Sequence, residues 1–216
     1  MTFIRRFLQD HPRILIEKMT VSQINAYFVK LESAGTNKSY LHKFVGQRDE
    51  KRVLFVDTAT VFISYAWAYE FVTVVVDVME QCYEEDPKCY FWFDLFTNDQ
   101  NNVVNKDFQW FCNTFQGSID AIGKVIVIIC PWYNPIVLTR AWCLLEIATS
   151  LISTKVLFDV KLPRSQLRSL KGFYSGALYY THNDSFLEAL KKINVEKATA
   201  QDPNDLKRIF EFIFGK

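Results

Sequence analysis

Trp142 and Glu146 are the residues of this chain whose types and spacing are best suited to chemistry. They are four residues apart in the segment 138–147, and residues at that spacing share one face of a helix. Apolar residues recur in the same region at the spacing of a core-facing helical stripe: Leu144, Ile147, Ala148 and Leu151. Glu146 falls about 150° from the middle of that stripe, so we expect the carboxylate and the indole to point away from the core.

Other kinds of chemistry find little support in the sequence. The phosphate-binding patterns G-x-G-x-x-G and G-x-x-x-x-G-K-[ST] are absent, and the chain has only seven glycines. The three histidines, His11, His42 and His182, have no metal-ligand spacing, so no metal site is expected. None of them is placed for a Ser–His–Asp or Cys–His hydrolase either. Cys143 could act as a nucleophile, although a buried cysteine is usually inert and we prefer that interpretation.

Composition indicates a folded intracellular protein. The chain has 216 residues, of which half are hydrophobic and 16% aromatic, enough for one α/β domain with additional elements. The net charge of +1 argues against a nucleic-acid binder with a broad basic surface. Five cysteines without a C-x-x-C pair fit a reducing compartment. No signal peptide and no apolar run of membrane-spanning length is visible, so we expect a cytoplasmic protein that binds neither nucleic acid nor membrane.

Four apolar runs predict the strands that position Trp142 and Glu146. These runs cover residues 60–65, 89–94, 125–130 and 153–160, and helical patterns separate them. The β-α-β-α-β-α order from 60 to 160 predicts a parallel sheet with helices on both faces. Valine is a poor helix former, so tertiary packing has to decide the valine-rich run at 72–76. Residues 176–180 are a predicted short edge strand.

The flanks of this α/β region are predicted to be helical. Residues 1–57 form a predicted N-terminal extension with a capping box at Thr20 and Gln23, whose role is packing or partner contact. Residues 58–216 form the main domain, with a core at about 59–180 and C-terminal helices over 181–216. One of these helices is capped by residues 183–185, and the last begins at Pro203. Gly123 is predicted to end the helix before the third strand.

The first two strands bring further residues toward Glu146, because parallel strands end at one edge of the sheet. The first leads to Tyr65 and Trp67, and the second leads to Asp94 and Phe96. A polar, Asn-rich loop at 97–106 follows and is a candidate substrate loop, although an ordinary surface connection is the simpler interpretation. Aromatic rings suit a flat base or a nicotinamide ring, and a carboxylate suits ribose hydroxyls or an oxocarbenium-like centre.

Together these stretches resemble a TIR domain. The resemblance rests on four boxes in order: Phe62-Ile63-Ser64-Tyr65, Trp92-Phe93-Asp94 with the polar loop, 121–132 around the third strand, and 138–147 with Trp142-x-x-x-Glu146. It covers about residues 59–180 and is greatest for the divergent TIR-like modules of protists, algae and fungi. Two features depart from the family pattern. Arg140 stands two residues before Trp142, where plant-type members have arginine directly before tryptophan, and the polar loop lacks the usual Arg-Gly segment.

The resemblance implies a flavodoxin-like three-layer fold with a five-stranded parallel sheet, and an NAD⁺ glycohydrolase that cleaves the nicotinamide–ribose bond. Glu146 would be the catalytic residue. Tyr65, Trp67, Phe96 and Trp142 would line the NAD⁺ pocket, and we add Asp94 to this set because it leaves the second strand beside Phe96.

The same resemblance implies the products and the partners. The products would be nicotinamide and either ADP-ribose or a cyclic ADP-ribose. NAD⁺ is the substrate and no cofactor is required. Members of the family generally need TIR–TIR assembly for activity, so we expect a homo-oligomer.

Two alternatives stay open at the level of sequence. A non-catalytic TIR-like interaction module would retain Glu146 as a remnant, and it predicts partner binding without turnover and a pocket filled by side chains. An N-glycosidase could instead act on a nucleotide or nucleoside other than NAD⁺, which a panel of substrates would distinguish.

Overall fold

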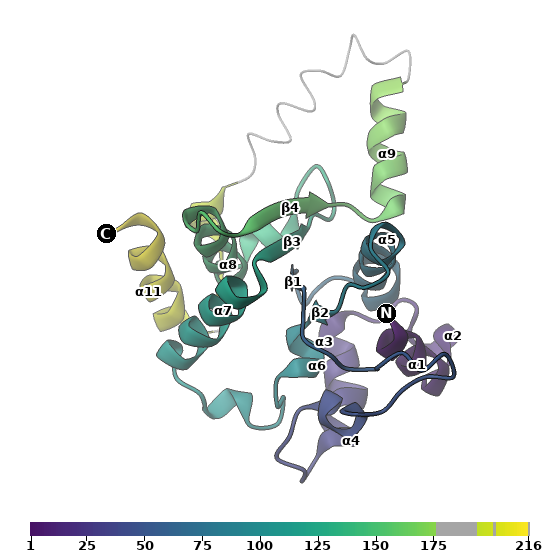
Figure 1. Ribbon diagram of the computed structural model, residues 1–216. Helices are drawn as coiled ribbons and strands as arrows, with labels where there is room; N and C mark the ends of the chain where they lie inside the picture. Colours follow the sequence, from purple (N-terminus) through teal and green to yellow (C-terminus); the bar gives the residue numbers. More distant parts are fainter. Residues whose placement is uncertain (176–193, 201, 216) are drawn as a thin grey trace.

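A parallel sheet lies at the centre of the computed structural model, which describes residues 1–175, 194–200 and 202–215 (Figure 1). Its strands are β1 (Val61–Ser64), β2 (Phe91–Trp92), β3 (Lys124–Ile128) and β4 (Leu157–Lys161). They lie in the order β2-β1-β3-β4, and every neighbouring pair is parallel. The four predicted runs therefore form the sheet, although β2 is only two residues long. Phe62 pairs with Trp92 on one side and with Val125 on the other.

The prediction of five strands is not met in the described part of the chain, where the sheet has four. The fifth strand was predicted at 176–180, which lies outside the described residues. The observed order is compatible with a flavodoxin-like fold. β1 is buried along its whole length because it lies inside the sheet with helices over both faces, whereas three of the five residues of the edge strand β4 are exposed.

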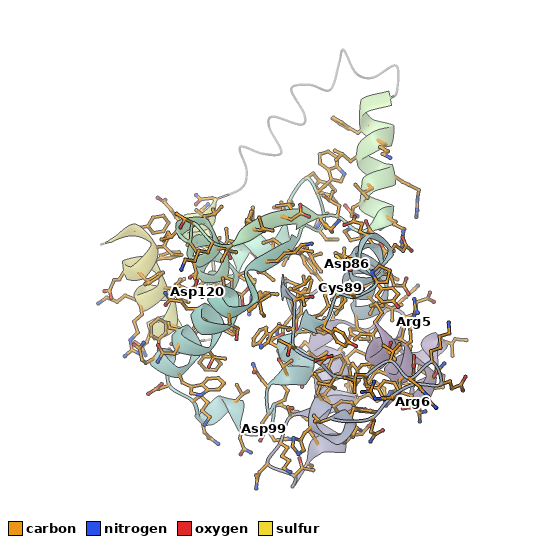
Figure 2. The ribbon with its side chains drawn as sticks, viewed as in Figure 1. Arg5, Arg6, Asp86, Cys89, Asp99 and Asp120 are labelled. Atoms are coloured by element: carbon orange, nitrogen blue, oxygen red, sulfur yellow. The ribbon has the colours of Figure 1, made fainter. Side chains whose placement is uncertain are left out.

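Helices cover both faces of the sheet, as predicted. Figure 1 shows α7 (Phe108–Ile122) and α8 (Ala141–Ile152) on one side and α5 (Asp77–Glu85) on the other. In Figure 2, Asp120 of α7 and Arg5 near the N-terminus lie on opposite sides of the strands. Helix α7 ends at Gly123, whose φ of 71° is the left-handed conformation expected of a glycine at that position.

The valine-rich run after β1 is helical. It forms the π-helix η3 (Phe71–Val76), which continues into α5. Five of its six side chains are buried, all except Thr73. Burial of these side chains outweighs the low helix propensity of valine, because each fully buried aliphatic side chain contributes roughly 1.5–3 kcal/mol while the propensity cost is below about 1 kcal/mol per residue.

The N-terminal extension packs into the same hydrophobic core as the sheet. Its helical segments are α1 (Thr2–Asp10), α2 (Arg13–Ile16), α3 (Val21–Ile24), η1 (Asn25–Val29), α4 (Lys30–Ser33) and η2 (Tyr40–Phe44). Phe3 and Phe7 of α1 contact Phe96, with ring centroids 4.9 and 5.0 Å apart. The predicted capping box is present, because Thr20 and Gln23 exchange hydrogen bonds at the start of α3.

The extension is also tied to the segment that follows β1. The amide of Val21 donates to the carbonyl of Tyr69, that of Ser22 donates to Trp67, and that of Phe71 donates to Met19. These bonds join two stretches almost fifty residues apart in the sequence, and they hold Thr20 and Ser22 beside the end of β1.

The remaining elements of the described part of the chain follow β2, β3 and β4 in the sequence. They are α6 (Asp94–Thr97), η4 (Val103–Asn105), η5 (Ile136–Thr139), α9 (Arg164–Ser175), η6 (Val195–Lys197) and α11 (Pro203–Phe214). Helix α11 begins at Pro203 as predicted, and its Ile209 packs on Ala141 and Leu145 of α8. The helix predicted after residues 183–185 lies outside the described residues. None of the helices in the described ranges is long and apolar enough to cross a membrane.

Candidate functional site

A cleft of about 940 Å³ opens beside the carboxyl ends of β1 and β2. Five of the six residues that the sequence singled out for a site line it: Tyr65, Trp67, Asp94, Trp142 and Glu146. They come from three segments, namely the exit of β1, the start of α6 and the first two turns of α8. The parallel sheet brings these segments to one edge, as expected for strands that share a direction.

The side chain of Glu146 points in a direction that the helical wheel did not predict. The prediction that it points away from the core is wrong, because the residue is only 9% exposed, whereas Leu151 of the predicted apolar stripe is 64% exposed. Helix α8 contacts β1 and β4 on one side and α7 and α11 on others, so more than one of its faces is covered. The single-stripe prediction fails for a helix that is packed on several sides. Glu146 therefore points inward, toward the end of β1.

One oxygen of the Glu146 carboxyl is anchored by β1. Ser64 Oγ, fully buried at the last position of the strand, donates to Glu146 Oε2 at 2.5 Å. No hydrogen bond to Oε1 comes from the described part of the chain. Burial raises the pKa of Glu146, the hydrogen bond from Ser64 opposes this rise, and the nearby Asp94 adds to it; together they bring the pKa to about 8. The raised pKa favours the protonated carboxyl at neutral pH, and a cation bound beside it would favour the carboxylate.

Asp94 holds two aromatic side chains of the cleft in place. The hydroxyl of Tyr65 donates to Asp94 Oδ1, and the indole nitrogen of Trp67 donates to Oδ2 at 3.1 Å. Burial raises the pKa of Asp94, and the two hydrogen bonds act in the opposite direction. Burial and the charge of Asp94 also raise the pKa of Tyr65, which keeps the phenol protonated as a donor. Both Asp94 oxygens are thus engaged by protein, so its role is to position Tyr65 and Trp67.

Trp142 forms an aromatic wall one helical turn before Glu146. Its ring contacts three phenylalanines of α7, with centroid distances of 5.4, 5.2 and 5.8 Å to Phe108, Phe111 and Phe115. Tilted and edge-to-face contacts of this kind orient an indole. The cleft therefore has an ordered apolar side next to its buried carboxyl.

The cleft brings together the other predicted binding residues but not Phe96. Phe96 is 1% exposed and lies among core rings, including Phe3, Phe7 and Phe71. The chain enters α6 directly after β2, so residues two positions apart no longer point the same way as they would on a strand. Asp94 consequently faces the cleft while Phe96 faces the N-terminal helices.

Cys143 lines the cleft but has the properties of an inert residue. It is buried, its thiol donates to the carbonyl of Tyr65 at 3.3 Å, and burial followed by the charge of Glu146 raises its pKa well above the usual range. A thiol must ionise to act as a nucleophile, so this environment disfavours a covalent role.

Several lining residues were missed by the sequence reasoning. They are Thr20 and Ser22 from the extension, Asp107 before α7, Arg140 before α8, and Asp202, Asp205 and Arg208 from α11. The capping box at Thr20 and Gln23 predicted where a helix starts, but it could not predict that this helix start lies beside the cleft. The candidate substrate loop at 97–106 borders the cleft through Asn98, Gln100, Val103 and Lys106.

No family model, no curated protein and no solved structure matches this chain. Its function therefore has to be inferred from the chemistry of the cleft: one buried carboxyl anchored by Ser64, an aromatic wall at Trp142, and a Tyr65–Asp94–Trp67 cluster beside them.

Proposed function

We propose that this protein is a TIR-like NAD⁺ glycohydrolase that cleaves the bond between nicotinamide and ribose. The observation that carries the proposal is the position of Glu146, a buried carboxyl in an open cleft that Trp142, Trp67 and Tyr65 also line. The aromatic rings suit the flat nicotinamide, and the carboxyl suits the sugar to which it is attached.

The chemistry follows from the charge of the substrate. Nicotinamide leaves NAD⁺ as a neutral molecule, so the reaction needs no general acid, and positive charge develops on the ribose as the bond breaks. The cationic ring favours the ionised form of Glu146 when it binds, since an opposite charge nearby lowers the pKa of a carboxyl. The carboxylate then stabilises the ribose cation. Water completes the reaction to ADP-ribose and a proton, and capture by an atom of the same molecule gives a cyclic product and a proton.

The unfilled volume of the cleft favours the proposal of an enzyme over that of a non-catalytic binding module. A module that keeps Glu146 as a remnant is expected to fill the pocket with side chains, whereas the volume here is about 940 Å³. Ligand sites for molecules of drug size usually have volumes of roughly 300–1,000 Å³, so a dinucleotide is a reasonable occupant. We also propose that activity requires self-association, as the resemblance implies.

The test incubates wild type or Glu146→Gln with NAD⁺ at high protein concentration. Chromatography then measures the nicotinamide that each protein releases. Glutamine keeps the shape but cannot carry the charge, so we expect a loss of about 100-fold or more. Glu50→Gln is the matched control, because Glu50 is an exposed glutamate outside the cleft. Equal release by wild type and Glu146→Gln would contradict the proposal, and so would no release by wild type under conditions that promote assembly.

A further inference from the structure

Three cations line the α11 side of the cleft, and none of them makes an ion pair within the described part of the chain: Lys106, Arg140 and Arg208. Two of them lie against aromatic rings instead. The Arg208 guanidinium is 5.4 Å from the ring centroid of Phe108, and the Lys106 ammonium is 5.5 Å from that of Trp110. A contact with a ring face leaves the N–H donors of these groups available to a ligand.

Three carboxylates share this side of the cleft, and two of them are engaged elsewhere. Asp107 Oδ1 accepts from the amide of Trp110 at the start of α7, at 2.8 Å. Asp202 Oδ1 accepts from the amide of Asn204 at the start of α11, also at 2.8 Å. Asp205 lies one turn before Arg208 without reaching ion-pair distance. The helix ends therefore use Asp107 and Asp202, and the cations make no ion pair with Asp205 within the described part of the chain.

An aromatic path connects Arg208 to Glu146. Arg208 lies over Phe108, the ring of Phe108 is 5.4 Å from that of Trp142, and Trp142 precedes Glu146 by one helical turn. A guanidinium presents paired donors that match phosphate oxygens, and aromatic faces stack on a base. The two ends of the cleft thus have different chemistry, one cationic and one with a buried carboxyl.

We propose that Arg208, together with Arg140 and Lys106, binds the diphosphate of a nucleoside diphosphate group at the α11 side of the cleft. The proposal rests on the proposed function in taking this cleft as a nucleotide site, and it adds Arg208, which lies beyond the TIR-like region of about residues 59–180. Arg208 makes the cleft select nucleotides that carry a diphosphate over nucleosides that lack one.

The experiment compares ADP with adenosine by isothermal titration calorimetry of the full chain, at about 0.15 M salt to screen distant charges. We expect ADP to bind wild type at least about tenfold more tightly than adenosine, because only ADP reaches the guanidinium. Arg208→Gln should lower ADP affinity about tenfold and leave adenosine affinity unchanged. Lys207→Gln is the matched control, because it removes the same charge from the adjacent, 80% exposed side chain of α11, which does not line the cleft.

Several outcomes would overturn this site. They are no binding of ADP to wild type, equal affinities for ADP and adenosine, and equal losses of ADP affinity in the two variants. Circular dichroism checks the fold, and Arg208→Lys replaces Arg208→Gln if the latter unfolds, with a smaller loss expected because lysine keeps the charge without the planar fork. If ADP binding depends on Arg208 but wild type releases no nicotinamide, the diphosphate site stands and the glycohydrolase proposal fails.

Discussion

At the scale of single residues, Glu146 combines two properties that oppose each other. Its burial favours the neutral acid, whereas the proposed reaction needs the carboxylate. A cationic substrate resolves the conflict, because its charge stabilises the ionised form at the moment of binding. Burial of this residue is therefore a cost to stability that the proposed function explains.

This cost predicts how stability depends on pH. The pKa of Glu146 is about 8 in the folded protein, against an ordinary value of 4.5, so the folded state keeps a proton that the unfolded state loses between these values. The stability of wild type should fall as pH rises through this window, and Glu146→Gln removes that contribution. From about pH 5 to about pH 8.5, the stability of Glu146→Gln relative to wild type should rise by roughly 3–5 kcal/mol.

Urea denaturation of the two proteins at both pH values measures this difference. Glu50→Gln, which changes an exposed glutamate, should follow wild type. A constant difference between Glu146→Gln and wild type at the two pH values would mean that Glu146 is ionised in the folded protein across this range.

At the scale of elements, α7 shows how local rules place the cleft wall. The helix carries Phe108, Phe111 and Phe115 to Trp142, and it ends at Gly123 just before β3 begins at Lys124. A glycine in the left-handed conformation stops a helix without strain. The end of α7 therefore also sets where β3 starts.

Two glycine substitutions in this element should have opposite effects. Gly123→Ala should destabilise the protein by about 1 kcal/mol, because alanine is strained at a φ of 71°, although an added Cβ would make only ordinary contact there. Gly117→Ala, in the interior of α7 with open space around it, should stabilise by about 0.5–1 kcal/mol. Thermal unfolding of both variants is the measurement, and a shift in the same direction for both would contradict this account.

At the scale of the whole molecule, the N-terminal extension and the sheet share one core. Phe7 is almost fully buried between Phe71 and Phe96, and Thr20 and Ser22 reach the cleft through backbone bonds to the exit of β1. The extension therefore supports the rings of the core and one side of the cleft together.

Removal of residues 1–57 should consequently prevent folding of the rest. The isolated 58–216 segment would expose Phe71, Phe96 and the other rings that α1 covers, and buried aromatic residues dominate the energetics of such cores. We expect a broad, non-cooperative thermal transition and binding of a hydrophobic dye. The full chain is the control. A sharp transition and an intact near-ultraviolet spectrum for the segment would show that the extension is dispensable for folding.

The sequence by itself determined the local elements of this protein. Continuous apolar runs located the strands and helical periodicity located α7, the Thr20–Gln23 pair marked a helix start, and the spacing of Trp142 and Glu146 placed both on one face. These features depend on residues within a few positions of one another, which is the range that a sequence pattern records.

Only the tertiary structure decided which way the key side chains point. Glu146 turns inward because α8 is packed on several sides, and Phe96 joins the core because α6 begins immediately after β2. Arg208 enters the cleft because Ile209 of α11 packs on α8. Each of these outcomes depends on contacts between segments far apart in the chain, so the periodicity of one segment cannot predict them. The carboxyl proposed for catalysis was thus identified from its neighbours in sequence, and its burial and pKa follow from its neighbours in space.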